Sequence, residues 1–451
     1  MPLRSGFLRF GAFLYPTGHH LAAWRHPDAI PGAGLQIQHY RALAQVAEAA
    51  RFDLIFLADG VGTRGNDPEV LSRTAHSYVS QFEPLTLLSA LSSVTQHIGL
   101  VGTASTSFNE PFHIARKFAS LDHLSGGRSG WNLVTSSSEH EARNFNRDAH
   151  FSHADRYERA GEFADVVLGL WDSWDTDAFA WDKATGRVFD PAKRHVLNHH
   201  GPHFQVQGPL NVARSPQGRP VVVQAGSSDA GKDLAARTAE VVFTAQQTLQ
   251  EAVDFYADLK GRVQAQGRDP DSLLIMPGVF PVVGRSESEA QEKFDQLQSL
   301  IDPVLGLSLI SGLTGGMDLS GYDLDGPIPE RPVTNASKSR QELTLQLARR
   351  ENLTLRQLYL RVAGARGHWQ LVGTPTQIAD QLEERFVHRG ADGFNVMAPV
   401  MPTGLTDFAE LVLPELRRRG LARTEYDGTT LRANLGLARP GDRAGLAQGL
   451  E

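Results

Sequence analysis

Residues 83–145 read EPLTLLSALSSVTQHIGLVGTASTSFNEPFHIARKFASLDHLSGGRSGWNLVTSSSEHEARNF, and this stretch decides the fold. A helical segment that begins at Pro84 leads to the apolar run HIGLVGT at 97–103, and one that begins at Pro111 leads to GWNLVT at 130–135. Proline is favoured in the first turn of a helix. Short, nearly continuous apolar runs are typical of strands that are buried on both faces of a parallel sheet. The stretch therefore predicts two consecutive helix–strand units of a parallel α/β protein.

The same alternation continues in both directions along the chain. Between the strands, apolar residues recur at helical spacing, as in Leu43, Val46, Ala47 and Ala50. Eight strands with intervening helices predict a (β/α)8 TIM-type barrel, and a doubly wound open sheet is the alternative. The predicted strands are 7–14, 53–58, 97–103, 130–135, 220–225, 240–244, 273–284 and 393–398.

Two long insertions interrupt the alternation, one after the fourth strand at 173–219 and one after the seventh at 302–345. Loops of this length inside a compact domain usually serve as lids, binding loops or contacts between subunits. Residues 421–451 are expected to be an irregular tail that wraps the outside of the barrel. We expect the whole chain, 1–451, to be a single barrel domain that forms a homo-oligomer, either a dimer or a tetramer.

Composition argues against several classes of protein. The chain has 451 residues, 41% hydrophobic and 21% charged, which is typical of a globular protein with a large core. Its net charge of -7 argues against nucleic acid as a partner. No apolar run is long enough to span a membrane and no signal peptide is evident, so we expect a cytoplasmic protein without a membrane partner. The absence of cysteine excludes disulfides, thiolate metal sites and cysteine nucleophiles.

Polar side chains follow the C-terminal ends of several predicted strands, which is where barrels of this type carry their active sites. Asp59 follows the second strand, and Thr103 and Ser105 lie at the end of the third. Ser136 follows the fourth strand. Because the strand ends of a barrel meet at one mouth, we expect these side chains to converge there.

An anion site is predicted after the fifth strand. Ser227 and Ser228 come just before a helix expected at 229–238, where free N–H groups and the helix dipole favour a phosphate. Alternatively, these serines only cap the helix. His153 and Tyr157 lie four residues apart at the start of another helix, so they share one face and could reach a bound anion. Otherwise, they are a surface pair that caps a helix.

Two groups of histidines raise the question of a metal site. The first group lies in an insertion beside glycine and proline, away from the strand ends, and no H-E-x-x-H pattern is present. The sequence therefore predicts that these histidines do not bind a metal ion. A metal-dependent hydrolase on the same barrel is the alternative function. The two groups are His195, His199, His200 and His203, and His140, His150 and His153.

The stretch 83–145 resembles the bacterial-luciferase-like flavin monooxygenases. It is most similar to the branch that contains nitrilotriacetate, dibenzothiophene sulfone and long-chain alkane monooxygenases. FDLIFLAD at 52–59 and GTPTQIADQL at 373–382 also resemble that branch. The similar motifs occur in the same order from about Phe10 to Gly420, so the resemblance covers the whole predicted barrel.

The resemblance implies that FMN binds at the C-terminal mouth, at the positions whose motifs match. Asp59 in FLAD falls at a flavin contact, and Asn132 in GWNLVTS falls beside the isoalloxazine ring. The phosphate side of FMN coincides with the anion site that the residues themselves predict. The implied cofactor-binding residues are Asp59, Thr103, Ser105, Asn132, Ser136, His153, Tyr157, Ser227 and Ser228.

The resemblance further implies an FMNH2-dependent monooxygenase, the oxygenase component of a two-component system. Such an enzyme inserts one oxygen atom from O2 into a small organic substrate through a flavin C4a-hydroperoxide. A separate NAD(P)H:flavin reductase would supply FMNH2, since no strand, G-x-G-x-x-G and helix fingerprint is present. His20, after the first strand, is the candidate general acid or base. An F420-dependent oxidoreductase on the same fold and a non-catalytic flavin-binding protein are further alternatives.

The substrate is not named by the sequence. Four aromatic residues could wall an apolar substrate pocket, although ordinary packing is the alternative for each and is favoured for Trp24. They are Phe13, Tyr15, Trp24 and Phe108. An anionic substrate would require arginine or lysine at the mouth. Arg64 and Arg73, on the loop after Asp59, are the candidates that the sequence offers.

Overall fold

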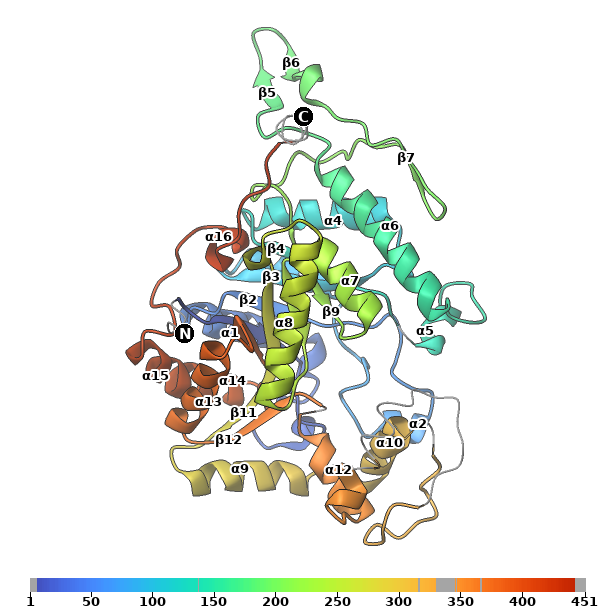
Figure 1. Cartoon of the computed structure of the whole chain (residues 1–451), viewed down its shortest axis with the longest axis vertical. Coiled ribbons are helices and arrows are strands. Elements are labelled where there is room, and N and C mark those ends of the chain that lie inside the picture. Colours follow the sequence, from blue (N-terminus) through green and yellow to red (C-terminus); the bar gives the residue numbers. More distant parts are fainter. Residues whose placement is uncertain are drawn as a thin grey trace.

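The centre of the molecule is a closed barrel of eight parallel strands (Figure 1). Going round the barrel, the order is β1, β2, β3, β4, β9, β10, β11 and β13, and β13 pairs with β1. The predicted TIM-type barrel is therefore confirmed, and each barrel strand overlaps a predicted run. The computed structural model describes residues 6–136, 138–314, 317–329, 345, 347–365 and 367–442. The barrel strands are β1 (Arg9–Phe13), β2 (Leu54–Leu57), β3 (Gly99–Ser105), β4 (Ser129–Val134), β9 (Val221–Ala225), β10 (Val241–Thr244), β11 (Leu274–Val283) and β13 (Gly393–Val396).

Helices surround the barrel, and α3, α4 and α13 begin at the three prolines Pro84, Pro111 and Pro375. The main helices are α1 (Ile37–Ala49), α3 (Pro84–Ser92), α4 (Pro111–Leu124), α6 (His153–Trp171), α7 (Asp229–Thr238), α8 (Leu249–Ala265), α9 (Glu287–Ser299) and α13 (Pro375–Val387). Shorter or later ones are α2 (Pro68–Leu71), α5 (Glu139–Arg143), α10 (Pro303–Leu313), α12 (Leu355–Ala363), α14 (Thr403–Asp407), α15 (Leu413–Arg418) and α16 (Leu431–Leu435). No helix among the described residues is long and apolar enough to cross a membrane.

Alternate residues of each barrel strand face opposite sides, as the period of a strand requires. Phe10 faces the helices and belongs to the large outer core, whereas Phe13 faces the barrel interior. Near the C-terminal ends of the strands, the ring of Phe13 lies 4.8 Å from that of Phe56 and 5.6 Å from that of Phe243. These three rings form an apolar layer beneath the mouth.

The insertion after β4 is confirmed, and it carries two small hairpins at the top of Figure 1. His199 Nε2 lies 2.8 Å from Glu162 Oε1, which attaches the second hairpin to α6. The hairpin strands are β5 (Phe179–Asp182) with β6 (Arg187–Phe189), and β7 (His199–His200) with β8 (Gln205–Val206).

The insertion after β11 is also confirmed: α10 lies within the predicted range 302–345, and the inserted segment continues beyond that range through α12. A ninth parallel strand, β12 (Trp369–Gly373), pairs with the outer half of β11 and was not predicted. Within the predicted range 302–345, residues 315–316 and 330–344 lie outside those that the structure describes.

The C-terminal tail differs from the prediction of an irregular segment on the outside. Residues 431–435 form α16, which lies beside the N-terminal side of the barrel strands, at the left of Figure 1. Leu431 is fully buried against Gly99 and Gly130, where the absence of a Cβ makes room for it. The tail therefore closes the N-terminal end of the barrel because its leucines fill space that the strands leave open. Residues 443–451 lie outside the described part of the chain.

Candidate active site

The C-terminal end of β9 and the beginning of α6 lie next to the N-terminus of α7. Ser228 caps α7, and its hydroxyl accepts a hydrogen bond from the Gly231 N–H at 3.2 Å. The Tyr157 hydroxyl lies 3.4 Å from Ser228 Oγ, and the His153 ring lies 4.9 Å from the Tyr157 ring. Ser227 precedes Ser228 and is exposed. The structure thus brings the predicted phosphate residues together.

The backbone around this site leaves space for a ligand. A Cβ on Gly231 would come within 3.1 Å of both Ser228 Oγ and Tyr157 Oη. The free N–H groups of the first turn of α7 point out of the same end of the helix. Hydroxyl groups, helix N–H groups and a histidine are the donors that a phosphate requires. The residues present therefore fit the phosphate of FMN.

The ends of β3 and β4 supply a second set of polar atoms inside the mouth. Thr103 Oγ1 donates to Leu57 O at 2.8 Å and accepts from Asn132 Nδ2 at 2.7 Å. Asn132 is 2% exposed, and its Oδ1 has no hydrogen-bond partner among the described residues. Because an unpaired buried carbonyl oxygen is costly, this oxygen is suited to accept a hydrogen bond from a bound molecule. An N–H of the flavin ring system has that chemistry.

Ser105 and Ser136 meet at the same mouth, with their hydroxyl oxygens 2.8 Å apart. Ser136 has a φ of 52°, a left-handed conformation that is uncommon for a residue other than glycine. Arg156 Nη1 donates to the Ser136 carbonyl oxygen at 2.8 Å and so holds this bend from α6. Strained backbone of this kind concentrates at functional sites.

Asp59 lies half-buried just after β2. Burial raises the pKa of its carboxyl to about 7, and the nearby carboxylates of Glu83 and Glu141 raise it further. Hydrogen bonds from the Gly60 N–H and the Gln81 side chain act in the opposite direction. Asp59 can therefore hold or release a proton near neutral pH at the mouth.

His20 is fully buried and has protein partners at both ring nitrogens. The Ala22 N–H donates to Nδ1 at 3.2 Å, so Nε2 carries the proton and donates to Gln298 Oε1 at 3.0 Å. Gln298 in turn donates to Leu360 O at 2.8 Å. These contacts join the segment after β1 to α9 and α12. The catalytic role of His20 stays a prediction, and this geometry suits a positioning role.

Three histidines that sequence reasoning did not select pack on the aromatic residues of the mouth. His19 Nε2 lies 2.8 Å from Phe13 O. The His76 ring stacks on Tyr15 with 4.7 Å between centroids, and His368 stacks on Phe243 at 5.1 Å. All three lie on loops outside the predicted strand ends, so only their residue type could have marked them.

Three histidines of the first predicted group, His195, His199 and His203, each pair with one carboxylate. His195 Nε2 lies 2.9 Å from Asp175 Oδ1, and His203 Nε2 lies 3.5 Å from Glu158 Oε1. Within the described ranges, no group of three or more histidine, aspartate or glutamate side chains is placed to hold a metal ion.

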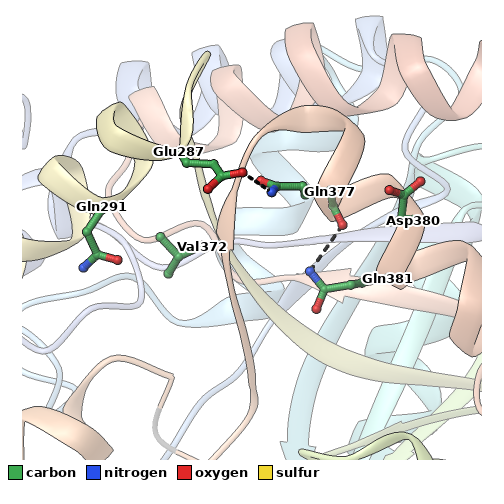
Figure 2. Close-up of a pocket in the computed structure, with 6 residues that line it drawn as sticks. All are labelled: Glu287, Gln291, Val372, Gln377, Asp380 and Gln381. Carbon is green, nitrogen blue, oxygen red and sulfur yellow. Dashed lines mark hydrogen bonds between the residues drawn. The ribbon is translucent and has the colours of Figure 1, made fainter.

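A groove of about 420 Å³ lies outside the mouth, between α9 and α13 (Figure 2). Gln377 Nε2 donates to Glu287 Oε1 at 2.5 Å across this groove, and Asp380 adds a second carboxylate. None of the predicted site residues lines it. Its acidic lining does not suit a phosphate.

The closed barrel, the anion site at α7 and the unpaired amide oxygen at the mouth define a barrel enzyme that holds a phosphate-bearing cofactor. Residues 17–393 match the family model of luciferase-like monooxygenases. The chain belongs to this family, so the predicted resemblance and the monooxygenase class are confirmed.

Two curated relatives are similar over nearly the full length. The chain is 51% identical to the N-acetyl-S-(2-succino)cysteine monooxygenase of Bacillus subtilis (strain 168), over 97% of this chain and 98% of that protein. It is 50% identical to the nitrilotriacetate monooxygenase component A of Aminobacter aminovorans, over 96% and 97%.

Solved structures agree with this assignment. The structure of riboflavin lyase with modified FMN and riboflavin is 34% identical, has a TM-score of 0.84, and matches 97% of this chain and 98% of that one. An F420-dependent secondary alcohol dehydrogenase has a TM-score of 0.58 at 14% identity, over 90% of this chain and 98% of that one. That level of identity shows a shared fold alone, and so gives no support to the F420 alternative.

Proposed function

We propose that the protein is the FMNH2-dependent oxygenase component of a two-component monooxygenase. A separate NAD(P)H:flavin reductase supplies the reduced flavin, and the substrate is a small organic molecule. The observation that carries the proposal is the site at α7, where Ser228 and Tyr157 flank free helix N–H groups. The relative named as component A of a monooxygenase supports the two-component arrangement.

The residues of the mouth divide the work of holding the cofactor. Ser227, Ser228 and the first N–H groups of α7 bind the phosphate, with Tyr157 and His153 closing one side. Asn132 Oδ1 accepts a hydrogen bond from the ring system. Because these donors and acceptors are fixed before binding, little entropy is lost when the cofactor is oriented.

Reduced FMN, when bound, supplies the electrons with which O2 is activated and split between the substrate and water. The chain contributes a dry environment through Phe13, Phe56 and Phe243, whose rings exclude water beneath the mouth. Asp59, with its pKa near 7, holds or releases a proton at the rim. The bend at Ser136 keeps its hydroxyl beside that of Ser105.

The phosphate site is tested by anaerobic titration of photoreduced FMN. Ser228→Ala and Tyr157→Phe should each weaken binding about tenfold, as expected for the loss of a hydrogen bond to a charged group. Ser286→Ala is the matched control, because Ser286 also caps a helix, α9, far along the chain from the mouth residues. Equal affinity in all variants would show that Ser228 only caps its helix, and the phosphate assignment would be rejected.

Oxygen chemistry is tested by rapid mixing of the protein and bound reduced FMN with O2. We expect a long-lived absorbing species that matches neither reduced nor oxidised FMN, and one atom of 18O from 18O2 in the product of a turned-over substrate. Prompt reoxidation at the rate of free flavin, with the flavin shown to be bound, would contradict the monooxygenase proposal.

A further inference from the structure

A second cavity, of about 590 Å³, opens between the start of α4, the start of α6 and the loop that precedes α6. Cavities of this size accommodate small organic molecules. Its walls combine aromatic rings and cations, among them Phe108, Phe145, Phe151, Lys117, Arg147 and Arg159. None of the predicted cofactor-binding residues lines it.

The cavity concentrates positive charge in a chain whose net charge is -7. Lys117, Arg147 and Arg159 face a single lining carboxylate, that of Glu110. Among the described residues, none of these three cations forms an ion pair, whereas Arg262 of α8 and Arg418 of α15 do. Unneutralised cations gathered in a concave site attract an anionic ligand.

Arg159 has the features of a prepared anion ligand. Its guanidinium carbon lies 4.2 Å from the centroid of the Phe204 ring and 5.5 Å from that of Phe151. Its Nε is buried and has no hydrogen-bond partner among the described residues. The stacked rings fix the plane of the guanidinium, and a planar guanidinium with free N–H groups is suited to bind a carboxylate.

The aromatic walls suit an apolar body next to the anionic group. The Phe108 ring stacks on Phe145 with 4.8 Å between centroids and 12° between planes. Phe145 remains 37% exposed, which is unusual for a ring whose role is only to pack in a core. Arg147 lies 3.6 Å above the Phe151 ring. The cavity therefore offers both apolar contact and charge.

The cavity adjoins the mouth of the barrel. Ser107, which lines it, donates its backbone N–H to Ser105 Oγ at 3.1 Å. Ser105 Oγ in turn contacts Ser136 Oγ inside the mouth. A molecule whose anionic end lies at Arg159 could therefore extend toward the oxygenation site.

The two arginines that were predicted for an anionic substrate, Arg64 and Arg73, do not line this cavity. Arg73 pairs with Glu69 and Asp302, and Arg64 donates to Tyr78 Oη at 2.6 Å while stacking on its ring. Arg73 is neutralised by its two carboxylates, whereas Arg147 and Arg159 bring positive charge without an ion pair into the cavity itself. Which arginines form ion pairs depends on the fold and could not be predicted from the sequence.

We propose that this cavity binds the carboxylate end of an organic acid, and that such acids are the substrate class of the enzyme. This proposal rests on the proposed monooxygenase function. It does not concern the cofactor, whose phosphate is assigned to Ser228 and α7.

The test is calorimetric titration of the protein with tricarballylate and with phenylsuccinate, and with phenylsuccinate dimethyl ester as the uncharged probe. At least one acid should bind and the ester should not. Arg159→Met should weaken binding of the acid at least tenfold, and Arg159→Lys, which keeps the charge, should restore part of it. Lys117→Met and Arg116→Met form a matched pair, since both remove one charge from α4 but only Lys117 lines the cavity. Only Lys117→Met should weaken binding.

Three results would overturn the proposal. The first is that neither acid binds, the second is that the ester binds as well as the acid, and the third is that Arg116→Met weakens binding as much as Lys117→Met. A fourth concerns the source of the anion: if Arg159→Met weakens reduced FMN and leaves the acids unaffected, the cavity serves the cofactor phosphate. Because the titration needs no flavin, reductase or oxygen, its failure is distinct from failure of the proposed function.

Discussion

Three residues at the mouth each have a feature that lowers the stability of the folded chain and that packing of the core does not require. Asn132 buries an unpaired oxygen, Ser136 holds a left-handed backbone, and Asp59 keeps a carboxyl in a place that disfavours its charge. Each lies at the C-terminal end of a strand. Costs of this kind persist where a binding site requires them, and their convergence at one mouth supports the assignment of the active site.

Asp59 should make the stability of the fold depend on pH. Its pKa rises from 3.8 to about 7 on folding, so between these values the unfolded chain has released a proton that the folded chain retains. Stability therefore falls as pH rises from about 4 to about 7. Asp59→Asn should leave stability unchanged at pH 4 and raise it at pH 8 by about 2 kcal/mol, after allowance for partial exposure. Urea unfolding at the two pH values measures this difference.

The exposed Asp254 on α8 provides the control. Asp254→Asn should show no comparable gain at pH 8. A gain for Asp59→Asn that is equal at both pH values would contradict the assigned cause, since an uncharged effect of the amide would not depend on pH.

Residues of the proposed site were predictable where the order of strands and helices already implies which side chains lie next to each other. Tyr157 and Ser228 meet as predicted because helix starts and strand ends share one face of a barrel. The partner residues of His20 and of Arg73 could not be predicted from the sequence. Gln298 lies on α9 and Asp302 caps α10, each more than 200 positions away in the chain, and no periodicity specifies which distant side chain will meet which.

At the level of elements, the barrel strands were predictable because each is a compact apolar run between helical segments. β12 was not predicted because it pairs with β11 alone, at the edge of the sheet, and three of its five residues are only half-buried. α16 was not predicted because it has only five residues, which are too few to show helical periodicity in the sequence. Elements that depend on one neighbour leave a weak signal in the sequence.

The contact between α2 and α10 depends on Arg73. Its side chain pairs with Glu69 of α2 and with Asp302, whose carboxylate caps α10. Exposed ion pairs contribute little to global stability, so Arg73→Met should leave Tm unchanged. We expect instead several-fold faster amide exchange in α2 and α10, because local opening requires fewer contacts to break. Hydrogen exchange with mass spectrometry measures this.

A pair elsewhere in the same insertion serves for comparison. Arg356 pairs with Asp325 at the start of α12. Arg356→Met should not alter exchange in α2 or α10. Unchanged exchange in those helices for Arg73→Met as well would show that the pair does not hold them together.

On the scale of the whole molecule, the two ends of the barrel have different roles. The C-terminal mouth holds unpaired polar atoms and adjoins the cationic cavity, whereas the N-terminal end is sealed by the tail. Arg432 of the tail pairs with Glu240 before β10, and Leu431 fills the space beneath the strands. Sealing one end confines ligand entry to the other.

A buried ion pair also attaches the tail to the start of the barrel strands, and its removal tests how much it contributes. Arg423 Nη2 lies 2.9 Å from Asp53 Oδ1, and both side chains are at most 3% exposed. Asp53 Oδ2 also accepts from the Phe10 N–H at 2.6 Å. Burial raises the pKa of Asp53, and Arg423 is the main opposing influence. Arg423→Met should therefore lower the free energy of unfolding by about 3 to 5 kcal/mol, because it leaves a buried carboxylate without its partner.

Adding Asp53→Asn to Arg423→Met should recover part of this loss, since the amide is uncharged and can still accept from Phe10. Arg418→Met, on an exposed pair with Glu415, should change stability by no more than about 0.5 kcal/mol. Urea unfolding at pH 7, followed by tryptophan fluorescence, measures all three variants. If Arg423→Met matched Arg418→Met, the ion pair with Asp53 would contribute nothing to holding the tail on the barrel. If the double variant were no more stable than Arg423→Met, the loss would come from the packing of Arg423 and not from the charge of Asp53.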